Sequence, residues 1–200
     1  MEIIGLIVLI FSAILHEVMH GVAAEKLGDP TARVAGRITL NPIPHIDPLM
    51  TILLPGLLLL SGSPFIFGAA KPVPVNPLFL KDGRKDMALV ALAGPATNLL
   101  LALCGALLLS SFGGINEILT ITLQYVVIYN IVLGLLNLIP IPPLDGSKFF
   151  TIILPEEMAI KYQAFAPFGI FVIFSLLFFT PAGDWFNTLI IQTLKVFGAY

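Results

Sequence analysis

The chain has 200 residues, of which 58% are hydrophobic and only 11% are charged. A soluble domain carries roughly 25% charged residues, so this composition excludes a soluble enzyme. It also excludes intrinsic disorder, because disordered chains are poor in apolar residues. A formal net charge of -2 creates no basic field and argues against a nucleic-acid partner. The class that remains is an integral membrane protein, with the lipid bilayer as its solvent.

Five apolar segments predict membrane-spanning helices. The hydrocarbon core of a bilayer needs about 20 apolar residues per helix. The segments that approach or exceed this length are 3–24, 87–112, 118–138, 163–180 and 184–199. The last two are joined by a sequence with proline and glycine that favours a tight turn. We therefore expect an all-α polytopic membrane protein with at least five spans.

The region between the first and second long spans contains a shorter apolar segment at 48–68. Pro55 and Gly56 interrupt this segment, so it is either a sixth, short span or a re-entrant element. A re-entrant element is allowed at membrane depth only where protein covers its backbone. Residues 37–40 and 71–77 flank it and are rich in β-branched residues or proline. We expect a short β-hairpin or re-entrant element here, and five to six spans in total.

Basic residues cluster in the connections that follow the odd-numbered spans or precede the even-numbered ones. They are Lys26, Arg33, Arg37, Lys81, Arg84, Lys85, Lys148 and Lys161. Short loops rich in lysine and arginine stay in the cytoplasm. This rule places the N-terminus outside the cell membrane and, with five spans, the C-terminus in the cytoplasm. It also requires segment 48–68 to return to the side from which it enters.

The first span contains two of the three histidines of the chain, in the sequence His16-Glu17-Val18-Met19-His20. Residues four apart share one face of an α-helix, so both imidazoles can reach one metal ion. The pattern H-E-x-x-H is typical of zinc proteases, in which the glutamate is the general base. Buried ionisable groups are costly in a membrane, so we interpret the motif as a zinc site rather than as structural histidines.

A catalytic zinc ion takes three protein ligands and keeps one position open. Asp145 is the best candidate for the third ligand. The prolines of Pro140–Pro143 interrupt the helix before it, and unwound backbone at membrane depth is tolerated where it lines a cavity. An interfacial aspartate at a proline-rich helix end is the alternative. Other acidic residues fit less well by their positions along the chain: Glu25, Glu117 and Glu156.

Three motifs, in this order, resemble the site-2 protease family of intramembrane zinc metalloproteases. They are His16–Gly21 (HEVMHG), Gly94–Asn98 (GPATN) and Asn137–Gly146 (NLIPIPPLDG). The resemblance covers residues 12–150 and is to the short form of the family, which lacks PDZ and CBS domains. It implies one integral-membrane metalloprotease domain over residues 1–200, with the catalytic core at 1–150 and C-terminal helices at 151–200.

The resemblance also implies roles for five of the motif residues. His16, His20 and Asp145 would ligate one zinc ion per chain, and Glu17 would be the general base. Asn137 matches the asparagine that lies beside the family's active site, where an amide can donate a hydrogen bond to a developing oxyanion. The substrates would be transmembrane proteins, cut near the cytoplasmic face of the membrane.

Three further residues are candidates for lining the site. Asn130 shares a helix face with Asn137, seven residues further on. Asn98 either lines the site or joins two helices as a packing amide, and His45 either caps the metal or is an ordinary loop histidine. Two other functions are compatible with these residues: a membrane metal-ion transporter, and a non-proteolytic binding protein of the same fold. No pattern in the sequence indicates an oligomeric state.

Overall fold

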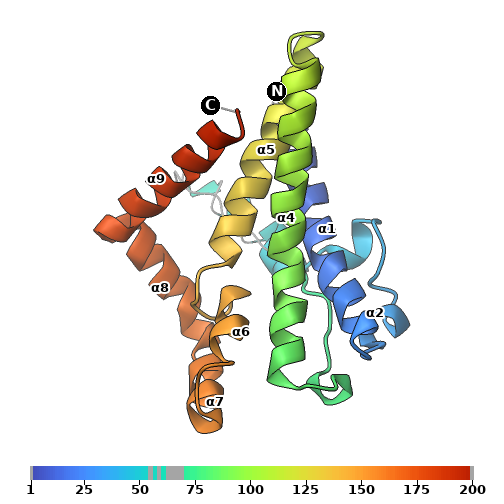
Figure 1. Ribbon diagram of the computed structural model, residues 1–200, viewed down its shortest axis with the longest axis vertical. Helices are drawn as coiled ribbons and strands as arrows, with labels where there is room; N and C mark the ends of the chain where they lie inside the picture. Colours follow the sequence, from blue (N-terminus) through green and yellow to red (C-terminus); the bar gives the residue numbers. More distant parts are fainter. Residues whose placement is uncertain (1, 54–55, 58–59, 62–69, 199–200) are drawn as a thin grey trace.

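Three long apolar helices form the centre of the molecule. The computed structural model describes residues 2–53, 56–57, 60–61 and 70–198, and this part of the chain contains helices but no strand. The long helices are α1 (Glu2–Lys26), α4 (Arg84–Phe112) and α5 (Glu117–Asn137), which pack against one another (Figure 1). The predicted all-α class is therefore confirmed.

These three helices correspond to the predicted spans at 3–24, 87–112 and 118–138. Each of them is long enough and apolar enough to cross a bilayer, as expected of a multi-pass membrane protein. α4 and α5 form an antiparallel hairpin (Figure 1). The side chain of Asn116 caps the start of α5 by accepting hydrogen bonds from the first backbone N–H groups of the helix.

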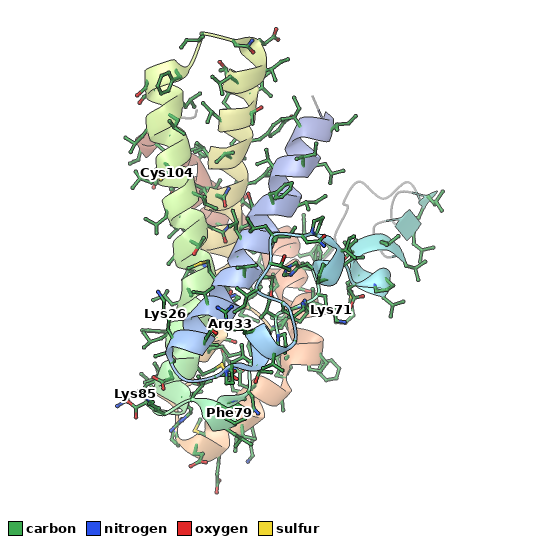
Figure 2. The ribbon with its side chains drawn as sticks, turned by 90° about the vertical axis from the view of Figure 1, so that its right-hand side faces the viewer. Lys26, Arg33, Lys71, Phe79, Lys85 and Cys104 are labelled. Atoms are coloured by element: carbon green, nitrogen blue, oxygen red, sulfur yellow. The ribbon has the colours of Figure 1, made fainter. Side chains whose placement is uncertain are left out.

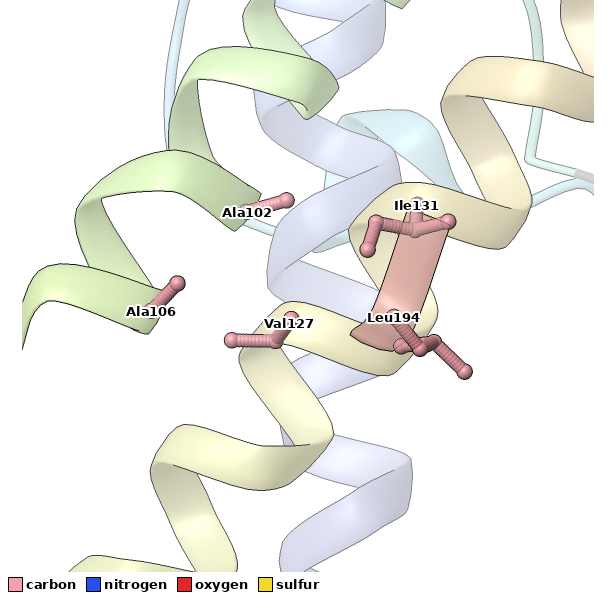
Figure 3. Packing of buried hydrophobic residues seen from close by; sticks show 5 residues of the cluster. All are labelled: Ala102, Ala106, Val127, Ile131 and Leu194. Atoms are coloured by element: carbon pink, nitrogen blue, oxygen red, sulfur yellow. The ribbon is translucent and has the colours of Figure 1, made fainter. Parts of the chain in front are cut away.

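Small side chains bring α4 close to α5. Ala102 and Ala106 of α4 lie beside Val127 and Ile131 of α5, and Leu194 joins the same buried cluster from α9 (Pro181–Val196) (Figure 3). Because lipid tails are as apolar as these side chains, close van der Waals packing between small residues is what favours helix association in a membrane. The cluster also holds α9 against the bundle.

The C-terminal part of the chain differs from the prediction. Its helices are α6 (Gly146–Phe150), α7 (Glu156–Ala164), α8 (Ala166–Phe179) and α9. α8 and α9 have 14 and 16 residues, and the chain bends by 70° between α7 and α8. Among the described residues, three helices meet the requirements of a span, or four if α7 and α8 form one broken span. Five to six spans are therefore not supported. The expected cytoplasmic C-terminus assumed five spans, so it no longer follows from the positions of the basic residues.

The connection between α1 and α4 contains short helical segments: α2 (Thr31–Val34), η1 (Ile43–His45), η2 (Pro48–Leu53) and η3 (Pro77–Phe79). The predicted β-hairpin is wrong, because neither 37–40 nor 71–76 forms a strand. Two prolines in the second stretch have no N–H to donate. Segment 48–68 is described only in part, and most of its predicted re-entrant course lies outside the described residues.

Basic residues gather at one end of the bundle. Lys26, Arg33, Lys71 and Lys85 all lie in the lower half of the molecule, whereas Cys104 lies higher on α4 (Figure 2). α1 ends and α4 begins at this lower end, and the turn between α4 and α5 lies at the other.

Candidate metal centre

Two buried histidines project from α1 toward α4. His16 and His20 are 7% and 8% exposed. The Nδ1 atom of His20 lies 2.8 Å from the backbone carbonyl of Val90, and the Nδ1 atom of His16 lies 2.5 Å from Oδ1 of Asn98. A carbonyl oxygen only accepts hydrogen bonds, so Nδ1 of each ring carries the proton. In the neutral rings, both Nε2 atoms then present lone pairs.

Asp145 completes a compact group with the two imidazoles. Its Oδ2 atom lies 3.0 Å from Nε2 of His16 and 3.3 Å from Nε2 of His20. The two Nε2 atoms lie 3.0 Å apart. The chain brings these residues together from α1 and from the segment between α5 and α6, 129 positions apart in sequence for His16 and Asp145. The three residues predicted as ligands therefore lie at one point in the structure.

The donor set fits a zinc ion. Two lone-pair nitrogens and a carboxylate oxygen at these distances repel one another unless a proton or a metal cation lies among them. Nitrogen ligands about 2.1 Å from zinc at tetrahedral angles lie about 3.4 Å apart, close to the Nε2 separation of 3.0 Å. Imidazole nitrogen and carboxylate oxygen are both ordinary zinc ligands.

The charge on Asp145 also suits this role. The Asp145 side chain is only 20% exposed. In its ionised form it adds a negative charge beside the two neutral imidazoles, and this charge offsets part of the charge of a divalent cation. A carboxylate is therefore a suitable third ligand.

Gly94 of α4 makes room for the two imidazoles. A Cβ atom at this position would lie 2.6 Å from Nε2 of His16 and 2.6 Å from Nε2 of His20. Real Cβ atoms do not approach other heavy atoms this closely, so any other residue here would push the rings away. The glycine of the Gly94–Asn98 motif thus has a steric function at the metal centre, which its position in the sequence alone does not reveal.

Glu17 lies beside the histidines and faces a different element. One ligand atom from each of His16, Glu17 and His20 lies within 4.8 Å of the other two. Oε2 of Glu17 accepts a hydrogen bond of 2.8 Å from the backbone N–H of Val73. This contact comes from residues 71–76, a segment in neither helix nor strand, which we call the strap.

Several side chains and main-chain groups fix the strap against the rest of the protein. The N–H of Lys71 donates to the carbonyl of His45, and the guanidinium of Arg37 donates to the carbonyl of Lys71. The N–H of Asn76 donates to Asp29, which is completely buried. These contacts use the N–H groups of Lys71 and Asn76 and the carbonyl of Lys71, which are backbone groups that a β-sheet would need.

Burial and hydrogen bonding move the pKa of Asp29 in opposite directions. Burial raises the pKa of this carboxyl, but donors from Thr31 and Asn76 outweigh it and hold the pKa below the ordinary value of 3.8. Asp29 accepts from the hydroxyl and the N–H of Thr31 and from the N–H of Asn76. The ionised carboxylate therefore joins the end of α1 to the strap.

The remaining predicted residues take different positions. Asn98 contacts His16 directly, and Asn130 contacts Asn98. The amide of Asn137 donates to the carbonyl of Leu133 in its own helix. His45 is buried in η1 with Nε2 3.0 Å from the carbonyl of Thr39. Within the described part of the chain, no hydrogen bond or ion pair joins Asn137 or His45 to the three candidate ligands.

Two main-chain groups at the centre could not be expected from the sequence. The carbonyl of Val90 orients His20, and the N–H of Val73 contacts Glu17. Every residue carries such groups, so no residue type marks the ones that function. The only available signal is indirect: Val73 stands between Pro72 and Pro74, which leaves its N–H as the sole donor of that tripeptide.

Comparison with known proteins agrees with the geometry. The sequence profile described as Peptidase family M50 matches residues 114–180. A Bacillus subtilis protein named "Putative zinc metalloprotease YwhC" is 40% identical over 191 residues, which cover 90% of this chain and 81% of that protein. Mycobacterium tuberculosis "Putative zinc metalloprotease Rip2" is 34% identical over 182 residues, which cover 88% of this chain and 66% of that protein. No solved structure matches the chain. The chain belongs to peptidase family M50, the site-2 protease family, and is an intramembrane zinc metalloprotease.

Proposed function

We propose that this protease cuts transmembrane proteins near the cytoplasmic face of the membrane, with one zinc ion held by His16, His20 and Asp145 and with Glu17 as the general base. The observation that carries the proposal is the convergence of three lone-pair atoms within 3.3 Å of one another, beside a fourth, acidic side chain. Zinc, when bound, supplies a Lewis acid that makes a water molecule acidic enough to lose a proton near neutral pH.

The protein's own residues would move that proton. Oε2 of Glu17 is occupied by the N–H of Val73, which leaves Oε1 to take a proton from the attacking water. Glu17 would then pass the proton to the leaving amine, as general acid–base catalysis requires. Asn137 has one N–H bonded to Leu133, and we assign its second N–H to the oxyanion that develops on the scissile carbonyl.

The position of the basic residues supports an orientation in the membrane. The ends of α1 and α4 that carry Lys26 and Lys85 lie on one side, and the positive-inside rule assigns this side to the cytoplasm. The N-terminus is then outside. In a Cys104→Ser background, a cysteine at Lys85→Cys should be protected from a membrane-impermeant maleimide in intact cells, and one at Glu117→Cys should react. The reverse pattern would overturn the orientation.

Glu17→Gln tests the assigned roles, because the amide keeps an oxygen for the N–H of Val73 but cannot accept the proton. Purified Glu17→Gln protein should hold one zinc ion per chain and lose cleavage of a transmembrane substrate by about 10²- to 10⁴-fold, the usual contribution of general acid–base catalysis. His16→Ala and Asp145→Ala should lose both zinc and activity. Full activity of the zinc-loaded Glu17→Gln protein would contradict the role of the base.

The two other functions have no observation in their favour. A metal-ion transporter using the same ligands would tolerate Glu17→Asp, since it needs only a charge at that position. A non-proteolytic binding protein would not need the base at all. Both relatives are named zinc metalloproteases, and this chain retains Glu17 between the histidines.

A further inference from the structure

A line of buried polar side chains runs from His16 into the apolar centre of the helix bundle. Asn98 of α4 is 0% exposed, Asn130 of α5 is 1% exposed and Ser12 of α1 is 4% exposed. Polar groups at this depth cost free energy unless they are hydrogen-bonded, so their presence calls for an explanation. All three helices of the bundle contribute one residue to this line.

The direction of every hydrogen bond in the line follows from one backbone carbonyl. The Nδ2 group of Asn130 donates to the carbonyl of Val126 at 2.9 Å and to Oγ of Ser12 at 2.8 Å. A carbonyl only accepts, so the amide orientation of Asn130 is fixed and its Oδ1 faces Asn98. Nδ2 of Asn98 must therefore donate to this oxygen, at 2.7 Å. That leaves Oδ1 of Asn98, 2.5 Å from Nδ1 of His16, as an acceptor.

We propose that Asn98, oriented by Asn130, is a positioning residue that keeps the proton of His16 on Nδ1 and aims the Nε2 lone pair at the metal. The proposal rests on the proposed function, because it assigns a role through the zinc ligand His16. His20 obtains the same tautomer from the carbonyl of Val90. One ligand is thus set by the main chain and the other by a side-chain relay.

The alternative explanation is that the two amides only join α4 to α5, as polar residues between membrane helices often do. The two explanations differ in what they predict for the metal. A packing contact affects the stability of the fold and leaves the ligand ring alone. A positioning contact affects zinc affinity, because partners of zinc-bound histidines typically contribute 10- to 100-fold to metal binding.

The test compares three variants of the full-length protein. Asn98→Ala removes the acceptor, Asn98→Asp keeps an acceptor oxygen for His16, and Thr97→Ala is the control. Thr97 is the adjacent residue of α4, and among the described residues its hydroxyl bonds only to the carbonyl of Ala93 in the same helix. Zinc dissociation constants are measured on metal-free protein by competition with a chelator, and thermal unfolding of the metal-free protein checks the fold.

Asn98→Ala should weaken zinc binding by about 10- to 100-fold, and Asn98→Asp should recover most of this loss. Thr97→Ala should bind zinc like the wild type. The proposal is overturned if Asn98→Ala binds zinc as tightly as the wild type, or if Asn98→Asp loses as much affinity as Asn98→Ala while both variants remain folded.

A measurement on the wild type keeps the proposal testable even if Asn98→Ala fails to fold. The chain has only three histidines, so ¹⁵N-labelled histidine gives a simple NMR spectrum. In metal-free protein at alkaline pH, His16 should show a protonated Nδ1 and an unprotonated Nε2. A proton on Nε2 instead would overturn the relay. Failure of the proposed function gives a different result, namely a wild type that binds no zinc or cleaves no substrate.

Discussion

Two faces of α1 hold the candidate centre in different ways. On one face, which we call the helix face, His16 and His20 point toward α4, where Gly94 leaves space for them. On the other face, which we call the strap face, Glu17 accepts a hydrogen bond from the main-chain N–H of Val73 in the strap. The first contact is made between two membrane helices, and the second between a helix and a connecting segment. The ligands and the base are therefore supported by separate parts of the fold, and mutations should affect them separately.

The largest effect is expected on the helix face. Gly94→Ala would place a Cβ atom 2.6 Å from the Nε2 atoms of both imidazoles, so the rings must leave their positions. We expect zinc binding to fall by more than about 100-fold, beyond the effect of losing one partner of a ligand, and cleavage to become undetectable. Metal analysis of the purified protein measures the first effect.

Gly134→Ala is the matched control for this substitution. Its Cβ would meet the flexible side chain of Leu99 at 3.0 Å and the backbone carbonyl of Pro95 at an ordinary contact distance of 3.4 Å, so the variant should keep its zinc and its activity. Equal zinc content in Gly94→Ala and the wild type would show that α4 does not limit the space of the ligands.

A smaller effect is expected on the strap face. Val73→Ala keeps the N–H that donates to Glu17, whereas Val73→Pro removes it. Val73 already precedes a proline and is therefore restricted to the β and polyproline II regions, and proline itself adopts the second of these. A hydrogen bond to a charged group contributes about 1.5 kcal/mol or more, so kcat of Val73→Pro should be about tenfold below that of Val73→Ala.

The comparison of these two variants is aimed at the N–H, since both of them remove the branched side chain of the buried Val73 and only Val73→Pro also removes the donor. Zinc content and KM should be the same in the two proteins, because the ligands are held by the other face of α1. A kcat that is equal in both variants would mean that the strap does not orient the base.

The helix face is also the part that the sequence predicts well. Its evidence is local: uninterrupted apolar runs predict α1, α4 and α5, and the spacing of His16 and His20 places both rings on one side of a helix. The position of Asp145 was predictable because proline interrupts the helix before it. The contact of Asn98 with His16 was not, because an asparagine in an apolar helix is equally compatible with simple packing.

The strap face and the C-terminal helices are where the predictions fail, for two physical reasons. The expected hairpin needs main-chain donors, but Pro72 and Pro74 have none, and the N–H groups of Val73 and Asn76 bond to carboxylates. The expected spans at 163–180 and 184–199 have the right apolar content. Their helices are shortened by the bend between α7 and α8 and by the helix start at Pro181, neither of which hydrophobicity reports.

The pH dependence of the strap should follow Asp29. Its pKa in the folded protein is held below the ordinary value of 3.8, so folding favours the ionised form. The stabilisation is complete above that ordinary value and is lost as the pH falls through the lower, folded-state value. Hydrogen exchange of the N–H of Asn76 should therefore be slow at neutral pH and accelerate, relative to other strap amides, only in strong acid.

Asp29→Asn should remove this pH dependence, since an amide does not ionise in that range. It should also weaken the anchor at neutral pH, because its NH₂ group cannot accept from Thr31 or Asn76. We expect a modest fall in thermal stability and unchanged zinc content. Protection of Asn76 that is identical in the two proteins at every pH would show that the carboxylate does not hold the strap.

The smallest effect is expected where charges meet at the surface. The guanidinium of Arg33 donates to both carboxylate oxygens of Glu25 at the end of α1, and its side chain is 64% exposed. Solvent and salt screen such pairs, and many of them contribute nothing measurable to stability. Arg33→Gln should therefore leave Tm, zinc content and kcat unchanged, and it serves as the reference for the strap variants. A loss of activity in Arg33→Gln comparable to that in Val73→Pro would mean that the strap face extends to α2, and that the base depends on the whole connection rather than on one main-chain amide.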